Sequence, residues 1–226
     1  MQVPTSAPCD LAELERRAQA IAGFSLGELA AMANVAVPAD FTRHKGWSGQ
    51  LIETWLGATA GSKPQQDFPE LGVELKTLPI SQSGQPLETT YVCYAPLILP
   101  PLTTWHTSNV KNKLQCVLWV PVEGERAIPV AERRIATPFL WQPDEHQSAQ
   151  LRQDWEELTE LIALGKVELI TARHGEVMQL RPKAASGQVL TDALDAEGNR
   201  IKTRPRGFYL RKQFTSAILA ARFAQG

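Results

Sequence analysis

The sequence predicts a globular α/β protein, and three observations support this fold class. Helix-type patterns with an apolar stripe are interspersed with short runs of strand-type alternation, as expected when helices cover a sheet. Hydrophobic residues make up 43% of the chain and charged residues 21%, which excludes an intrinsically disordered protein. A length of 226 residues suits one large domain or two small lobes with a buried core.

The first part of the chain is expected to be helical, over residues 10–23, 25–35 and 47–61. Asp10 is a suitable N-cap for the first helix, and Gly23 is a suitable C-terminal stop. Ser25, followed three residues later by a glutamate, has the capping-box pattern of a second helix start. The third helix carries an apolar stripe for the core, with Glu53 on the flank of that stripe.

The central region is expected to form strands at residues 72–79, 89–97 and 116–124, with a short helix at 107–115. The first strand alternates apolar and polar residues, which predicts a half-buried strand. The last, CVLWVPVEG, is almost continuously apolar, which predicts a strand covered on both faces.

The C-terminal half is expected to contain a long helix at 147–166, strands at 166–172 and 176–182, and a terminal helix at 206–224. The sequence contains no internal repeat and no low-complexity linker. We therefore expect one domain over residues 1–226, with lobes of about 1–105 and 106–226.

The cysteines and the termini indicate the compartment. Cys9, Cys93 and Cys116 are widely spaced and form no CxxC pair, which favours a reducing cytoplasm. The N-terminus lacks the basic and apolar regions of a signal peptide. The most apolar stretch, YVCYAPLILPPL, is short and broken by three prolines, so no membrane span is expected.

Charge is balanced overall but uneven along the chain. The formal net charge is −1, which argues against a general nucleic-acid coat but leaves room for a localised basic face. Residues 200–226 contain seven Lys or Arg residues and no acid. Residues 144–160 contain six acids and one basic residue, Arg152. This asymmetry predicts a C-terminal face for an anion and an acidic helix facing solvent or a protein partner.

The stretch QDFPELGVELKTLPI, residues 66–80, holds the most informative charges. Alternation in a strand places Glu74 and Lys76 on one face. Asp67 lies before a loop in which Gly72 allows a sharp entry into the strand, so both carboxylates are able to converge on one cation. Mg²⁺ suits such a site because it accepts one or two carboxylates together with water and phosphate oxygens. The alternative is an exposed charge pair on an ordinary strand, which contributes only ~0–1 kcal/mol.

A lysine next to such a cation has a defined role in phosphodiester hydrolysis. Its ammonium is able to hold the attacking water and offset the negative charge that develops on the phosphate. Glu53 on the preceding helix is a further carboxylate that would orient water or help to bind a second metal. The order Glu53, Asp67, Glu74, Lys76 thus favours a metal-dependent nuclease.

The chain resembles the MutH family of DNA mismatch-repair endonucleases over nearly its whole length. The resemblance rests on HKGWSGQLIETWLGATAGSKPQQDFPELGVELKTLPI and continues through KNKLQCVLWVPVEGER, DWEELTELIALGKVELITARHGE, LRPKAA and RGFYLRKQFTSAIL. It implies a restriction-endonuclease-like fold, in which helices flank a mixed sheet and two lobes form a DNA-binding cleft. It also implies Mg²⁺-dependent nicking of the unmethylated strand at hemimethylated GATC sites, on the 5′ side of the guanine.

The resemblance further implies the partners and the roles of single residues. The enzyme would act as a monomer on double-stranded DNA and be activated by MutL after MutS finds a mismatch. Asp67 and Glu74 are similar to the metal-binding carboxylates, Lys76 to the catalytic lysine and Glu53 to an auxiliary acid at the metal. Lys113 is similar to a further lysine of the active-site region.

Six positions are similar to family residues that contact DNA: Lys45, Gly46, Arg181, Pro182, Lys183 and Tyr209. A guanidinium pairs bidentately with guanine in the major groove, whereas a lysine meets either a base or a phosphate. Tyr209 is similar to the aromatic residue that senses adenine methylation, since a ring near adenine N6 would clash with a methyl group. Without the resemblance, Tyr209 would be interpreted as a core aromatic.

One residue departs from the family pattern, and two rival functions remain open. His44 stands where relatives carry an acid before KGW, which puts DNA affinity or its pH dependence in question. The first rival is a GATC-specific restriction enzyme that cuts both strands. The second is a non-catalytic DNA-binding module, which the full set of carboxylates disfavours because these groups repel phosphate.

Overall fold

The structure of the chain is a computed structural model that describes residues 1–41, 43–44, 46–61, 63–183 and 188–224. The chain divides into two compact units. The first unit consists of Met1–Leu87 and Gln115–Gln142, and the second of Glu88–Leu114 and Pro143–Gly226. The units alternate along the sequence, so they differ from the lobes expected from a single boundary near residue 105.

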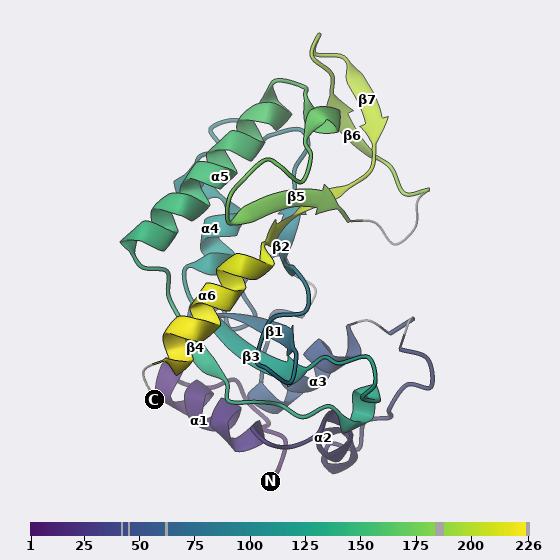
Figure 1. Cartoon of the computed structure of the whole chain (residues 1–226), viewed down its shortest axis with the longest axis vertical. Coiled ribbons are helices and arrows are strands. Elements are labelled where there is room, and N and C mark those ends of the chain that lie inside the picture. The colour runs from purple at the N-terminus through teal and green to yellow at the C-terminus, as the bar shows by residue number, and fades with distance from the viewer. Residues whose placement is uncertain (42, 45, 62, 184–187, 225–226) are drawn as a thin grey trace. The chain divides into compact units, whose positions relative to one another are not determined.

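The first unit contains a mixed sheet with helices packed against it (Figure 1). Its elements are α1 (Leu11–Ile21), α2 (Leu26–Met32), α3 (Trp47–Leu56), β1 (Glu74–Ile80), β3 (Val117–Glu123), η2 (Val130–Glu132) and β4 (Phe139–Trp141). The strand order is β1-β3-β4, in which β1 and β3 are parallel and β3 and β4 antiparallel. The register pairs Glu74 with Val117 and Lys76 with Trp119.

The predicted helix signals are confirmed in this unit. The side chain of Asp10 caps α1 by accepting a hydrogen bond from the backbone N–H of Glu13. Ser25 and Glu28 form the predicted capping box at the start of α2. The apolar stripe of α3 is buried, and β3 is buried along almost its whole length, as a strand covered on both faces should be.

The second unit combines an antiparallel sheet, a separate hairpin and helices (Figure 1). Its elements are β2 (Thr90–Ala95), η1 (Trp105–Thr107), α4 (Asn109–Leu114), α5 (Glu145–Ala163), η3 (Val167–Leu169), β5 (Met178–Pro182), β6 (Thr191–Leu194), β7 (Arg200–Thr203), β8 (Arg206–Leu210) and α6 (Lys212–Phe223). The sheet has the strand order β2-β8-β5, and β6 pairs with β7. Together the two units confirm the predicted α/β class.

Two predicted elements in the second unit are wrong. The stretch 166–172 is not a strand: Gly165 ends α5 in a left-handed conformation, and the chain continues as the 3₁₀ turn η3. The expected terminal helix 206–224 begins with β8, and helix α6 starts only at Lys212. Residues 206–210 are a strand because they pair with β2 on one side and β5 on the other, which local sequence does not reveal.

The hairpin β6–β7 is held against the end of α5 by a close backbone approach (Figure 1). A Cβ atom added at Gly165, which has φ +67°, would lie 2.0 Å from the carbonyl oxygen of Asp195 in the hairpin turn. Within the turn, the side chain of Asp195 accepts hydrogen bonds from the backbone N–H groups of Glu197 and Asn199. The hairpin is therefore a fixed element of the second unit.

We expect Gly165→Ala to lower the free energy of unfolding by about 2 kcal/mol, because it adds this clash to the ~1 kcal/mol cost of a left-handed backbone. The matched control is Gly198→Ala in the hairpin turn, where φ is +83° but nothing lies within 4 Å of the added Cβ. Urea denaturation of both variants separates the cost of the steric clash from the cost of the left-handed backbone conformation. Equal losses in the two variants would show that the approach of the hairpin to α5 contributes nothing.

Within the part of the chain that the structure describes, no helix has the length and apolar character needed to cross a bilayer.

Candidate active site

A tight turn brings Asp67 to the beginning of β1 in the first unit. Phe68 and Val73 exchange backbone hydrogen bonds of 2.9 and 3.2 Å, which closes the loop between them. Gly72 has φ +66°, a conformation that glycine adopts without strain, and its carbonyl accepts a hydrogen bond from the Gln66 side chain at 2.6 Å. The sharp entry into the strand that Gly72 predicts is confirmed.

The carboxylate of Asp67 lies at the free edge of β1. Its Oδ2 accepts a hydrogen bond from the backbone N–H of Leu75 at 2.8 Å. The preceding N–H, that of Glu74, instead bonds to the carbonyl of Cys116 at 3.0 Å, next to β3. Successive N–H groups of a strand point to opposite sides, so β3 occupies one side and Asp67 the other. Asp67 and the start of β1 are thus neighbours, although seven positions separate Asp67 from Glu74.

Glu74 and Lys76 form a buried ion pair. Lys76 Nζ lies 2.5 Å from Glu74 Oε1, and the side chains are only 14% and 2% exposed. The contact confirms that the two side chains share a face of the strand. The burial rules out the alternative of an exposed pair on an ordinary surface strand. A buried pair is costly to desolvate and adds little net stability, so its presence indicates a functional role.

Glu53 lies in α3, which packs next to β1, and is half-buried. Its Oε1 would be 4.0 Å from a Cβ added at Gly49, so the carboxylate bends back along the helix. Gly46 is the exposed N-cap residue of α3. Lys45 lies outside the described residues, and the side chain of His44 is exposed.

The described residues contain no group of three or more His, Cys, Asp or Glu side chains arranged to hold one ion. Asp67 and Glu74 still fit a magnesium ion, which takes one or two protein carboxylates and completes its octahedron with water and phosphate oxygens. The hard oxygen donors of this pair are of the type that Mg²⁺ prefers.

A second cluster of predicted residues lies on the sheet of the second unit. Tyr209 in β8 is opposite Gln179 in β5, and the guanidinium of Arg181 is 5.6 Å from the centre of the Tyr209 ring. Arg181 also donates a hydrogen bond to the hydroxyl of Thr89 at 2.8 Å. Burial raises the pKa of Tyr209, an effect that the charge of Arg181 opposes. Tyr209 is half-buried, so it is not a core aromatic, and it carries a neutral phenol at neutral pH.

Sequence reasoning missed Tyr91 and Tyr94, which belong to the same surface. The Tyr91 ring lies 5.3 Å from that of Tyr209 and 5.9 Å from that of Tyr94, and the ammonium of Lys183 is 4.4 Å above it. Tyr91 and Tyr94 are three positions apart, which in a regular strand would place them on opposite faces. A register shift between Tyr91 and Cys93 brings them together. The aromatic content of TTYVCYAP was the available signal, but the bulge was not predictable.

Contact with an aromatic ring also explains a glycine in β8. A Cβ added at Gly207 would lie 2.8 Å from the ring of Tyr91, so this close packing requires a residue without a side chain.

The remaining predicted residues of the second unit differ in exposure. Pro182, next to Arg181 in β5, is exposed, as is Arg181 itself. Lys113 is in α4 of the second unit and is half-buried.

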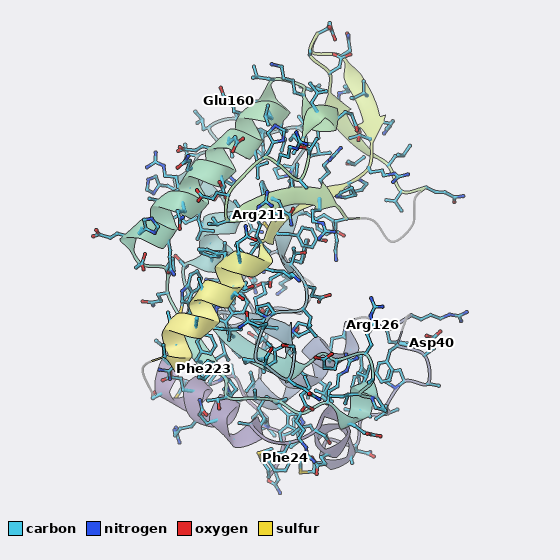
Figure 2. All side chains as sticks on the ribbon, viewed as in Figure 1. Phe24, Asp40, Arg126, Glu160, Arg211 and Phe223 are labelled. Atoms are coloured by element: carbon cyan, nitrogen blue, oxygen red, sulfur yellow. The ribbon has the colours of Figure 1, made fainter. Side chains whose placement is uncertain are left out.

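The acidic residues of α5 differ in their burial. The side chain of Asp154 is buried and accepts hydrogen bonds from the backbone N–H groups of Glu176, Val177 and Met178 at 2.7–2.8 Å. Glu160 lies on the exposed face of the same helix (Figure 2). Asp154 therefore stabilises the fold, and only the exposed acids of α5 are available to a partner.

Comparisons with known proteins identify a family and close relatives of this chain. A family model described as DNA mismatch repair enzyme MutH matches residues 56–154. A DNA mismatch repair protein MutH from Klebsiella pneumoniae (strain 342) is 60% identical over 219 residues, which cover 97% of this chain and 95% of that protein. Proteins of the same name from Enterobacter sp. (strain 638) and Escherichia coli O139:H28 are each 59% identical. They align over 218 and 211 residues, covering 96% and 93% of this chain and 95% and 92% of the relatives.

Proposed function

The chain belongs to the MutH family of DNA mismatch repair enzymes, and from this we propose that it nicks the unmethylated strand of hemimethylated GATC sites in a Mg²⁺-dependent reaction. The observation that carries the chemistry is the buried Glu74–Lys76 pair beside the carboxylate of Asp67. Membership of this family makes the chain a DNA mismatch repair endonuclease. The dependence on Mg²⁺, the recognition of GATC and the choice of the unmethylated strand are parts of the proposal.

Asp67 and Glu74 would hold the metal. When bound, Mg²⁺ supplies positive charge to the scissile phosphate and lowers the pKa of the attacking water. The hydrogen bond from the Leu75 N–H keeps the carboxylate of Asp67 in place before any ligand arrives. Such preorganisation avoids a reorganisation cost during the reaction.

Lys76 supplies the protein's own positive charge at this site. Its ammonium pairs with the buried carboxylate of Glu74. In the proposed reaction it would hold the attacking water and offset the charge that develops on the phosphate. Glu53 and Lys113 are proposed as auxiliary residues, Glu53 to orient water or assist with metal binding. The overall reaction adds water across one P–O bond: the oxygen of the attacking water bonds to phosphorus and gives up a proton to solvent, while the P–O bond to the leaving strand breaks and its oxygen takes up a proton from solvent.

The aromatic and cationic residues of the second unit are proposed to read the DNA. Arg181 presents an exposed guanidinium for a bidentate contact with a guanine, and Lys183 presents an ammonium to a base or a phosphate. The neutral ring of Tyr209 would lie against the N6 side of an adenine, where a methyl group collides with it. Pro182, Lys45 and Gly46 are proposed to approach the DNA backbone or the bases.

The remaining parts of the proposal come from the family. The chain would form one restriction-endonuclease-like domain whose two lobes enclose double-stranded DNA. It would act in the cytoplasm as a monomer that MutL activates once MutS has found a mismatch. The exposed acids of α5 are the proposed contact surface for MutL.

A cleavage assay with each DNA strand labelled separately tests the proposed function. With Mg²⁺, we expect nicking of only the unmethylated strand of a hemimethylated GATC duplex, and no cleavage of a fully methylated duplex or after chelation by EDTA. A duplex with GATC changed to GTAC is the sequence control. Rapid cutting of both strands of an unmethylated duplex would instead indicate a restriction enzyme, and binding without cleavage in Mg²⁺ would indicate a non-catalytic module.

A further inference from the structure

Two adjoining pockets of the second unit share Pro182 and Arg206 in their walls. The first has a volume of about 500 Å³ and is lined by Ile170, Thr171, Ala172, Gln179, Leu180, Arg181, Pro182 and Arg206. The second has a volume of about 390 Å³ and is lined by Glu168, Pro182, Leu190, Lys202, Thr203, Arg204 and Arg206. We call the two together the edge groove, because it runs from the end of β5 to β7.

The edge groove is lined by more basic than acidic side chains. Its basic residues are Arg181, Lys202, Arg204 and Arg206, and its lining contains one acid, Glu168. The charge of Glu168 is already engaged: its carboxylate accepts hydrogen bonds from the Thr203 hydroxyl and from Arg206 Nη2. Arg206 is itself only 9% exposed along its side chain, so it forms a fixed part of the wall.

The guanidinium of Arg204 is accessible to an anionic ligand. Arg204 is exposed, and among the described residues its side chain has no ion pair or hydrogen bond. Lys202 is 63% exposed, and its ammonium lies 2.9 Å from Asp192 on the neighbouring strand. That exposed pair is weak, so a phosphate that approaches Lys202 competes with Asp192 at little cost.

The supports of the groove are rigid. The hairpin that carries Lys202 is fixed against the end of α5 by the backbone approach of Asp195 to Gly165. Arg206 belongs to β8 and pairs in register with Pro182 in β5. Cations on fixed strands lose less conformational entropy on binding an anion than cations on a flexible tail.

The basic C-terminal segment therefore has two parts with different roles. Arg211, before α6, donates through Nη2 to the backbone carbonyls of Ala172, His174 and Gly175 (Figure 2). Its guanidinium is committed to the fold. Lys202 and Arg204 instead face the groove, next to Arg181, which lies beside Tyr209.

We propose that the edge groove binds a backbone phosphate of the DNA next to the base pairs that Arg181 and Tyr209 contact. Arg204 makes the direct ionic contact and Lys202 assists it, so the groove adds affinity without adding sequence information. This inference rests on the proposed function, because it requires that the same face binds duplex DNA. Neither Lys202 nor Arg204 takes part in the cleavage chemistry.

The first test is the salt dependence of GATC-duplex binding, measured without Mg²⁺ by fluorescence anisotropy. Each phosphate contact adds about 0.9 to the slope of log K against log salt. We expect Arg204→Ala to reduce this slope by about 1 and the double variant with Lys202→Ala to reduce it by more than 1. The control is Arg200→Ala, an exposed cation in β7, four residues before Arg204, that does not line the groove. Equal slope changes for Arg200→Ala and Arg204→Ala would overturn the proposal, since they would show a general charge effect.

The second test locates the contact on the DNA. One phosphate at a time is replaced by an uncharged methylphosphonate, and the affinities of the wild-type protein and of Arg204→Ala are compared. We expect a phosphate whose neutralisation weakens the wild type by several-fold and leaves Arg204→Ala unchanged. Additive losses at every position would overturn the groove contact while leaving the proposed function intact. If the proposed function itself is wrong, the wild type will show no preference for the GATC duplex over the GTAC control.

Discussion

Glu74→Gln is expected to lower the rate of GATC cleavage at least about a hundred-fold while leaving the affinity for the GATC duplex nearly unchanged. Glutamine has the shape of glutamate but not its charge, and a metal held by Asp67 alone would lose half of its carboxylate ligands. Lys76→Met should cause a similar loss, because the protein's own positive charge beside the phosphate is then missing. Single-turnover cleavage with excess enzyme measures the chemical step directly.

Burial of the pair means that loss of activity must be separated from loss of fold. Breaking a buried ion pair by removing one partner costs up to about 3–5 kcal/mol, because the other charge stays buried and uncompensated. Glu74→Gln leaves Lys76 as the remaining charge, and because 14% of the Lys76 side chain is exposed, a loss below this range is expected for that variant, whereas Lys76→Met leaves the 2% exposed carboxylate of Glu74 without its partner. The double variant Glu74→Gln/Lys76→Met removes both charges and should regain much of that stability, as measured by urea denaturation.

The decisive comparison is therefore between stability and activity in the double variant. We expect a stably folded protein that binds the GATC duplex but does not cleave it. Magnesium should raise the melting temperature of the wild type and not that of the double variant, since a ligand that binds only the folded state stabilises it by mass action. A double variant that cleaves at the wild-type rate would refute the roles proposed for Glu74 and Lys76.

The arrangement of Asp67, Glu74 and Lys76, the proposed catalytic cluster, was predictable because its geometry follows from local rules. Period-two alternation places Glu74 and Lys76 on one face, and the left-handed Gly72 allows the turn that returns Asp67 to the strand edge. The number of carboxylates that would bind the metal was not predictable in this way. Whether Glu53 joins the two other carboxylates depends on how its side chain lies along α3, where it bends back toward Gly49.

The surface proposed to contact DNA and part of the fold depend on long-range strand pairing, which one sequence does not show. Tyr91 and Tyr94 share a face only because of a bulge in β2. Local sequence does not predict that residues 206–210 form strand β8, because its two partner strands are more than twenty residues away. The hairpin β6–β7 was missed because its strands are short and largely polar. Helices with clear caps, such as α1 and α2, were predicted correctly because their signals are local.

Asp154→Ala is expected to lower the free energy of unfolding by about 3–5 kcal/mol. The carboxylate is 3% exposed and accepts hydrogen bonds from the N–H groups of residues 176–178. A hydrogen bond to a charged group contributes about 1.5–3 kcal/mol, and donors left buried without an acceptor cost more. Since natural domains are stable by only about 5–15 kcal/mol, the variant should melt well below the wild type.

The matched control is Glu156→Ala on the exposed face of α5, where the side chain forms an exposed ion pair with Arg152 at 2.7 Å. It should cost less than about 1 kcal/mol. The loss of unfolding free energy for Asp154→Asn should lie between those of the two alanine variants, because its amide keeps one acceptor oxygen but turns a donor toward the N–H groups. Equal urea midpoints for Asp154→Ala and Glu156→Ala would contradict the structural role of Asp154. The same comparison governs any search for the MutL surface: charge reversal at Glu156 and Glu160 reports on the partner, whereas charge reversal at Asp154 reports on unfolding.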